Sequence, residues 1–148
     1  MDIDFSEITL DNNIRIVLSE FSTTNAVAAN FIFGVGSRYE DDEFAGASHL
    51  FEHMLFKGTK KRPSPKEISS VIENTGGVIN AFTDKEITGY WANFPKENTF
   101  ESIDLFSDII QNSLMKENDL NLEKNVVIEE IKSSLDNPYS LCNLNFEK

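Results

Sequence analysis

The sequence predicts an α+β fold, a two-layer α/β sandwich in which helices cover a mainly antiparallel sheet. Three observations favour it. A length of 148 residues suits a single domain, here taken as residues 1–148. Hydrophobic residues make up 40% of the chain, which is enough for a packed core. Pairs of strand-like segments also alternate with pairs of helix-like segments, as expected when helices pack on a sheet.

Five segments have the features of strands. Residues 8–10 and 14–18 flank a short run of Asp and Asn, residues that suit a tight turn, so they predict a hairpin. Residues 26–35 are apolar and glycine-rich at their end, which favours a largely buried strand. Residues 78–81 and 88–94 predict the arms of a second, longer hairpin.

Four segments have the features of helices. We expect the first over residues 49–57, with Ser48 as its N-cap. The second begins at Ser64-Pro65 and reaches Asn74, because proline is favoured in the first helical turn. Residues 100–112 have apolar positions at helical spacing, and residues 120–135 precede an Asn-Pro pair that ends a helix.

The charge balance excludes one class of partner. The formal net charge is −12, from 25 acidic and 13 basic residues, and phosphate backbones need Lys and Arg, so we expect no nucleic acid. A basic partner or substrate suits this sign better, although solubility alone would explain it equally well.

Nothing in the sequence predicts secretion or membrane insertion. Cys142 is the only cysteine, so no intrachain disulfide can form, as is usual in a reducing compartment. The acidic first residues resemble neither a secretory signal nor a mitochondrial transit segment. No run approaches the ~18 apolar residues that span a bilayer. We therefore expect a cytoplasmic protein without a membrane partner.

The two histidines of the chain carry the strongest chemical signal. His49 and His53 stand four residues apart with Glu52 between them, so all three share one face of a helix. Two imidazoles one turn apart can bind one Zn²⁺, and the intervening carboxylate can reach a water beside it. A fortuitous pair on a surface helix is the simplest alternative. A structural zinc site would need four protein ligands, usually rich in cysteine.

A third ligand should be a carboxylate on another element. The helix over residues 120–135 carries Glu123, Glu129 and Glu130 among apolar residues. A carboxylate on the buried side of such a helix needs a partner, and a metal is one. Periodicity does not choose between Glu129 and Glu130, and an acidic helix face is more often simply solvated.

Several motifs together resemble the insulinase–pitrilysin family of zinc peptidases, which includes mitochondrial processing peptidase and its bacterial relatives. The first is His49-Leu50-Phe51-Glu52-His53 with the following residues to Thr59. The other motifs occur in the same order as in the family: residues 9–13, the glycines near Ser37-Arg38, residues 76–83, residues 88–90 and residues 123–131. The resemblance covers essentially the whole chain.

The resemblance implies a role for each matching residue. It makes His49, His53 and Glu130 the ligands of Zn²⁺ and Glu52 the general base. It makes Glu123 a second acidic residue that supports the site. The implied activity is that of a zinc-dependent endopeptidase acting on peptides or unfolded protein segments.

The resemblance also implies a substrate strand at Asn80, Ala81 and Phe82. An unpaired edge strand can bind an extended peptide by forming a further strand of the sheet, although the same residues would also suit an ordinary hairpin. Trp91 departs mildly from the family, which usually has an aromatic such as Tyr there.

Length is the larger departure. Family members pair the zinc-bearing domain with a similar second domain or subunit, and the tail from Tyr139 carries apolar residues that need a partner. We therefore expect an N-terminal zinc-binding domain that is incomplete at its C-terminal end. The alternative function is a non-catalytic or incomplete peptide-binding subunit that needs a partner half.

Overall fold

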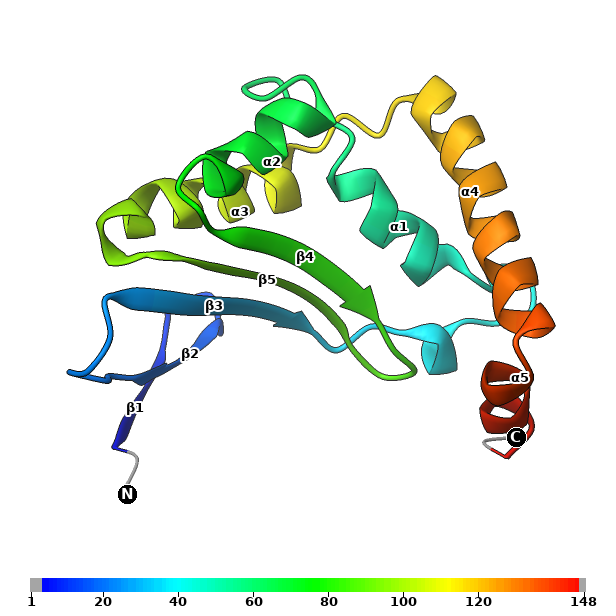
Figure 1. The fold of residues 1–148 in the computed structure, drawn as a ribbon, viewed down its shortest axis with the longest axis horizontal. Helices are drawn as coiled ribbons and strands as arrows, with labels where there is room; N and C mark the ends of the chain where they lie inside the picture. Colours follow the sequence, from blue (N-terminus) through cyan, green and yellow to red (C-terminus); the bar gives the residue numbers. More distant parts are fainter. Residues whose placement is uncertain (1–3, 147–148) are drawn as a thin grey trace.

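The computed structural model describes residues 4–146, which form a curved sheet with helices over one of its faces (Figure 1). This confirms the predicted two-layer α+β arrangement. The elements, in chain order, are β1 (Phe5–Thr9), β2 (Arg15–Ser19), β3 (Ala26–Phe33), a 3-10 turn (Ser37–Tyr39), α1 (Ala47–Leu55), α2 (Pro65–Glu73), β4 (Val78–Thr83), β5 (Thr88–Pro95), a 3-10 turn (Lys96–Asn98), α3 (Thr99–Asn112), α4 (Glu117–Asp136) and α5 (Pro138–Phe146).

Both predicted hairpins form. Strands β1 and β2 pair with each other as a separate antiparallel sheet, and the main sheet has the antiparallel order β3-β5-β4. The central strand β5 pairs with β3 on one side and with β4 on the other, with Ala92 opposite both Ala29 and Ile79. The outer edge of β4 is unpaired within the described chain.

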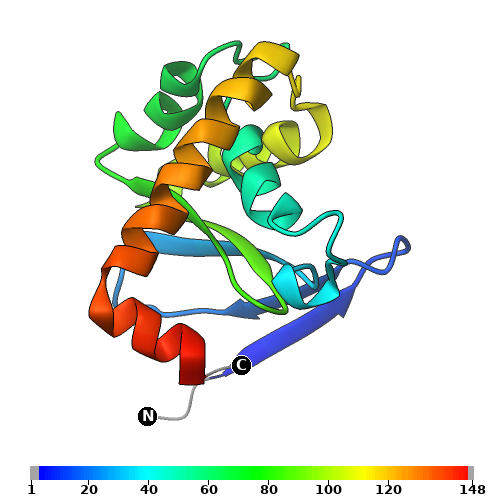
Figure 2. The same ribbon diagram turned by 90° about the vertical axis from the view of Figure 1, so that its right-hand side faces the viewer.

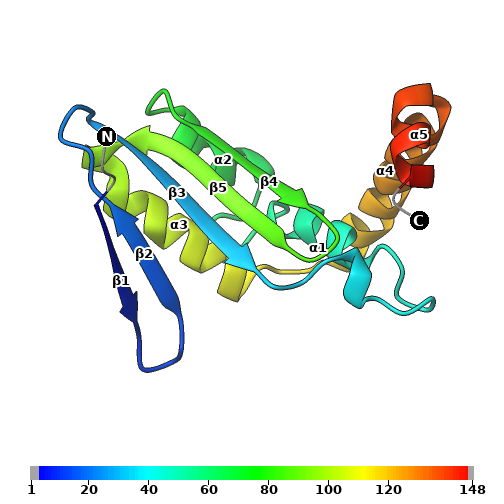
Figure 3. The same ribbon diagram turned by 90° about the horizontal axis from the view of Figure 1, so that it is seen from below.

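Strand β3 differs from the prediction of a largely buried strand ending at Val35. It ends at Phe33, and its residues alternate between partly buried and exposed. The reason is that helices α1, α2 and α3 cover only one face of the sheet, whereas Figure 3 views the opposite face. Alternate side chains of a strand point to opposite faces, so Phe31 packs toward the core and Ile32 remains 52% exposed.

The core lies between the sheet and the helices. Phe31 stacks on Phe106 of α3 with ring centroids 4.6 Å apart. Full burial of one such large side chain contributes roughly 1.5–3 kcal/mol, so this layer fixes the helices on the sheet. The buried residues of this core are Leu55, Ile68, Ile72, Tyr90, Ala92, Phe94, Leu105, Phe106 and Ile109.

Helix α2 begins as predicted, but α1 does not. Ser64 accepts the N–H of Glu67 through its hydroxyl at 3.3 Å, and Pro65 stands in the first turn. The prediction of Ser48 as the N-cap of α1 was wrong. Gly46, in the left-handed conformation at φ 91°, precedes the first helical residue, and Glu40 instead accepts the N–H groups of Gly46 and Ser48, both at 2.6 Å.

Helices α4 and α5 stand at one end of the sheet, with α4 packed on α1 (Figure 2). α4 begins three residues earlier than predicted and ends before Pro138 as predicted, and the tail forms the additional helix α5. No helix within residues 4–146 is long and apolar enough to cross a membrane. Five apolar residues of α4 are each more than 40% exposed: Leu122 and Val126 on one side of the helix, and Ile128, Ile131 and Leu135 on the other.

Candidate metal centre

Helix α1 presents both histidines and Glu52 toward α4 and the end of β4. Its start is fixed by Glu40, which belongs to the preceding loop and is hydrogen-bonded to the first N–H groups of the helix. Burial opposes ionisation of Glu40, but the hydrogen bonds from Ser48 and Gly46 outweigh it and hold the pKa of its carboxyl below the ordinary value. A negative charge at a helix N-terminus is also favoured by the helix dipole.

Three ligand atoms converge between α1 and α4. Nε2 of His49 lies 3.2 Å from Nε2 of His53. Oε2 of Glu130 lies 3.5 Å from the first nitrogen and 3.6 Å from the second. Ligands about 2.0–2.1 Å from a tetrahedral zinc ion would be roughly 3.3 Å from one another, so the spacing suits this metal.

The chemistry of the donors points in the same direction. Two imidazoles and one carboxylate are a usual three-ligand set for zinc in catalytic sites. His49 and Glu130 are partly exposed, with 36% and 49% of their side chains accessible, while His53 is more enclosed at 18%. An open position beside the three ligand atoms is what a catalytic site requires and a closed structural site lacks.

The structure separates the two adjacent carboxylates that periodicity left open. Glu130 lies beside the histidines. Glu129 is 71% exposed and accepts a hydrogen bond from Nζ of Lys132 at 2.7 Å. Consecutive residues of a helix differ by about 100° in direction, so only one of the two can face α1.

Glu123 supports the site from behind His53. Its Oε2 lies 3.0 Å from Nδ1 of His53, and its Oε1 lies 2.5 Å from Nζ of Lys57. Glu123 is only 7% exposed, and burial opposes its ionisation, but the hydrogen bonds from Lys57 and His53 outweigh this and lower the pKa of its carboxyl. An ionised carboxylate only accepts hydrogen bonds, so Nδ1 of His53 carries the proton.

The contact with Glu123 determines which ring nitrogen His53 offers to its other neighbours. With Nδ1 directed at Glu123, Nε2 of His53 faces His49 and Glu130. Nε2 of His53 and Oε2 of Glu130 are 3.6 Å apart, close enough for both to bind one cation. The three converging atoms could therefore hold a metal ion.

Glu52 is held by the end of strand β4. The Thr83 hydroxyl donates a short hydrogen bond to Oε2 of Glu52, which leaves Oε1 for another partner. Beneath it, the buried hydroxyl of Tyr90 finds no hydrogen-bond partner among the described residues. Burial first, and the charge of Glu52 second, raise the pKa of Tyr90 above its ordinary value.

The predicted substrate residues lie on the same strand. Asn80, Ala81 and Phe82 occupy β4, whose position at the sheet edge agrees with the prediction. The Ala81 N–H donates to Oδ1 of Asn80 at 2.8 Å. Phe82 is 38% exposed, and its ring packs over Gly89, where an added Cβ would lie 2.4 Å from it. Their role in binding stays a prediction.

A match to a family model decides the relationship of this chain to known proteins. The model for insulinase, peptidase family M16, matches residues 15–145. The chain belongs to the insulinase family. Helix α1, with the His49, Glu52 and His53 motif, lies within the matched residues.

Several proteins of similar sequence are named as proteases or peptidase subunits. The chain is 44% identical over 130 residues to an uncharacterized zinc protease of Bacillus subtilis, covering 88% of this chain and 32% of that protein. It is 40% identical over 123 residues to the mitochondrial-processing peptidase subunit beta of Dictyostelium discoideum, covering 82% and 26%. The chain thus spans about a third or less of these insulinase-family relatives.

Solved structures agree with the fold. A protease from Helicobacter pylori superposes with a TM-score of 0.88 at 29% identity, covering 94% of this chain and 33% of that one. Pitrilysin superposes with a TM-score of 0.80 at 23% identity, covering 90% and 14%. The α+β sandwich is therefore the insulinase-family fold.

Three supporting residues were missed from the sequence. Lys57 follows the histidine motif and Thr83 ends the β4 motif, so both lie inside or beside segments already recognised. Neither a lysine nor a threonine indicates such a role by its type alone. The sequence spacing that reveals metal ligands does not extend to residues that hydrogen-bond to those ligands from behind. Glu40 had no signal, because its contact with α1 depends on how the intervening loop folds.

Proposed function

We propose that this chain is the zinc-bearing part of a metalloendopeptidase that hydrolyses peptides or unfolded protein segments. The observation that carries the proposal is the convergence of His49, His53 and Glu130 at spacings that suit zinc, with Glu52 on the same helix face. The zinc-protease names of the relatives support the choice of metal.

His49 and His53 would hold the ion through Nε2, and Glu130 through a carboxylate oxygen. When bound, Zn²⁺ supplies Lewis-acid chemistry: it polarises a carbonyl and makes water acidic enough to react near neutral pH. Glu123, which is itself paired with Lys57, would orient the ring of His53 through Nδ1 so that Nε2 faces the ion. Such supporting contacts are a regular part of zinc sites.

Glu52 would act as the general base. Thr83 occupies its Oε2, so Oε1 takes the proton of the attacking water and later passes it to the leaving amine nitrogen. The edge of β4, with Asn80, Ala81 and Phe82, would bind the substrate as an additional strand beside this carboxylate. The same strand would then hold both the peptide and the base.

A second homologous domain or subunit would complete the enzyme. Support comes from the short span of the chain relative to its relatives, one of which is named as a subunit. The exposed apolar residues of α4 offer contacts for such a part. The alternative, a non-catalytic peptide-binding subunit, needs the same fold but no working base. We also propose that the protein is cytoplasmic.

Metal analysis with a pair of neighbouring variants tests the proposal. Glu130→Gln should lose most of its zinc, whereas Glu129→Gln, one residue away and paired with Lys132, should keep it. Zinc retained in the first variant and lost in the second would overturn the ligand assignment. Glu52→Gln should keep zinc and abolish hydrolysis in the complete enzyme. A Glu52→Gln enzyme with near-normal kcat, or a zinc-loaded wild type without peptidase activity, would favour the alternatives.

A further inference from the structure

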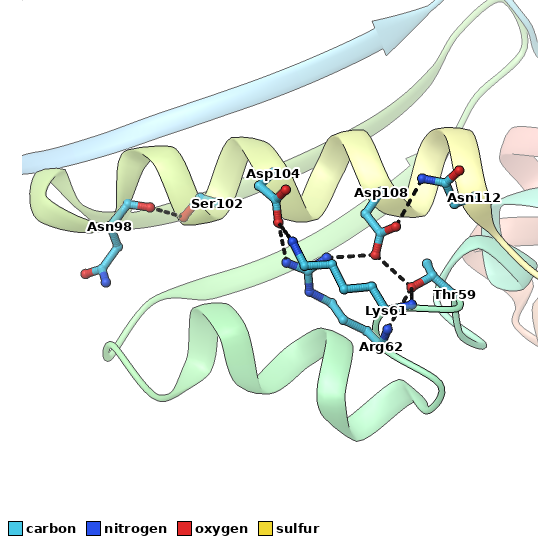
Figure 4. Close-up of polar contacts among 8 residues, drawn as sticks. All are labelled: Thr59, Lys61, Arg62, Asn98, Ser102, Asp104, Asp108 and Asn112. Atoms are coloured by element: carbon cyan, nitrogen blue, oxygen red, sulfur yellow. Dashed lines mark hydrogen bonds and ion pairs between the residues drawn. The ribbon is translucent and has the colours of Figure 1, made fainter.

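A buried polar network lies outside the metal centre, between the loop after α1 and the last turns of α3 (Figure 4). Oδ2 of Asp108 accepts hydrogen bonds from the Thr59 hydroxyl and from Nη1 of Arg62, both at 2.7 Å. The Thr59 hydroxyl in turn accepts the N–H groups of Lys61 and Arg62, at 3.1 and 2.8 Å. A single aspartate on α3 thus fixes the whole turn.

The centre of the network is buried. Thr59 is 0% exposed, and Arg62 and Asp108 are each 8% exposed. Asn112 donates to the second oxygen of Asp108 at 3.1 Å, and Asp104 accepts from Nη2 of Arg62 at 2.6 Å (Figure 4). Charged groups with so little access to water keep one arrangement, because any other would leave a buried charge without a partner.

This turn also holds the connection that leads into α4. Thr59 forms an isolated antiparallel bridge with Ser113, and the N–H of Leu114 donates to the carbonyl of Gly58 at 2.9 Å. The Ser113 hydroxyl donates to the carbonyl of Met54, in the last turn of α1, at 3.2 Å. The connection that leads into α4, up to three residues before its first residue, is therefore tied both to the turn and to the helix that carries the histidines.

The direction of α4 matters because Glu130 lies far along it. Thirteen residues separate Glu117 from Glu130, a distance of about 20 Å along a helix axis. A rotation of about 5° at the start would move Glu130 by roughly 1.7 Å, whereas a functional site tolerates about 0.5 Å. Partway along, the contacts of Glu123 with Lys57 and His53 hold α4 on α1, so the turn at the start and this contact together determine where Glu130 lies.

We propose that Thr59 and Asp108 are positioning residues for the metal centre: by holding the turn against α3 they set the direction of α4 and thereby the place of Glu130. The proposal rests on the proposed function for the identity of the metal ligands. A purely structural role would predict lower stability of the whole domain, without a selective effect on α4.

The test uses Thr59→Val in the full-length protein, because valine has the shape of threonine but lacks the hydroxyl that Asp108 and the two N–H groups need. Thr59→Ser, which keeps the hydroxyl, is the rescue variant. Ile72→Val, on the buried face of α2, is the control for general destabilisation. Asn112→Ala, which removes a single bond to Asp108, replaces Thr59→Val if that variant does not fold.

Two quantities are measured: the zinc Kd by competition with a chelator, and amide hydrogen exchange of α4 and α2 in the metal-free protein. Thr59→Val should raise the Kd about tenfold, the lower end of the range for residues behind metal ligands. It should also speed exchange in α4 more than in α2, and Thr59→Ser should restore both values. Ile72→Val should leave the Kd unchanged.

An equal zinc Kd in Thr59→Val and Ile72→Val, with exchange raised equally in α4 and α2, would overturn the positioning role. A wild-type protein that binds no zinc would instead refute the proposed function. In that case the selective exchange of α4 still decides whether the turn sets the direction of this helix.

Discussion

Replacing Glu123 with Gln should weaken zinc binding about 10- to 100-fold, which corresponds to roughly 1.4–2.8 kcal/mol. The structure gives the reason. The Glu123 carboxylate is 7% exposed and serves both Lys57, at 2.5 Å, and Nδ1 of His53, at 3.0 Å. Glutamine has the same size but only one acceptor oxygen, so one of these two donors loses its partner, and the charge that favours the proton on Nδ1 is gone. Loss of one charge-assisted hydrogen bond should also lower the free energy of unfolding by about 1.5–3 kcal/mol.

The assay is chelator competition at neutral pH, together with thermal unfolding of the metal-free protein. Glu129→Gln on the same helix is the matched control, since it removes an exposed carboxylate whose partner is Lys132. Lys57→Met should weaken zinc less than Glu123→Gln, because His53 keeps its carboxylate partner. Zinc affinities of the Glu123 and Glu129 variants that agree within a factor of about two, with only the first less stable, would refute this reasoning and leave Glu123 a role in folding alone.

Three further predictions follow. Thr83→Val should lower kcat of the complete enzyme about tenfold without changing KM or zinc content, because only the hydrogen bond that orients Glu52 is lost. Thr83→Ser, which keeps the hydroxyl, should stay close to wild type. Steady-state kinetics measures this, and an unchanged kcat in Thr83→Val would contradict it. Asp108→Asn should lower the free energy of unfolding by about 1.5–3 kcal/mol at pH 7, because Arg62 loses one of its two carboxylate partners and keeps Asp104. Burial opposes ionisation of Asp108, yet hydrogen bonds from Thr59 and Arg62 lower its pKa in the folded protein, so its contribution to stability is present above about pH 4 and is lost as the pH falls through that lowered pKa. In urea unfolding at several pH values, the stabilities of wild type and variant should therefore converge in acid. A difference in stability that stays constant with pH would contradict this. The 148-residue chain alone should be a poor peptidase that self-associates through the exposed apolar residues of α4. Sedimentation and a peptide-cleavage assay would show this, and a monomer that cleaves peptides efficiently would contradict it.

Local rules account for most of the fold that could be predicted. The Ser64-Pro65 start of α2 and the Pro138 end of α4 depend on backbone geometry within one or two turns, so the sequence alone determines them. The hairpins follow from turn residues between apolar segments in the same way. Where the boundaries differed, as at the start of α4, they shifted by three residues or fewer.

The misses concern features that depend on what lies opposite. The apolar residues of β3 suggested burial on both faces, but helices cover only one, so Ile32 and half of the strand remain exposed. Ser48 is a good N-cap by type, yet Glu40 takes that function from six to eight residues away because the intervening loop folds back. Neither the coverage of a sheet nor the return of a loop can be read from local periodicity.

The residues of the metal centre likewise fall into those that local spacing predicts and those that depend on packing. His49, Glu52 and His53 share a helix face because of their spacing, so one turn of helix brings them together whatever the rest of the chain does. The choice between Glu129 and Glu130 depends instead on how α4 is rotated against α1. An amphipathic helix would reveal that rotation through its apolar side, but α4 has apolar residues on several sides, and five of them remain exposed. The rotation is set by the contacts of Glu123 with Lys57 and His53 on α1 and the loop after it. Glu129 faces away and pairs with Lys132 within α4 itself. The sequence therefore predicts the residues that α1 contributes to such a site, whereas the ligand from α4 is determined by how the two helices pack.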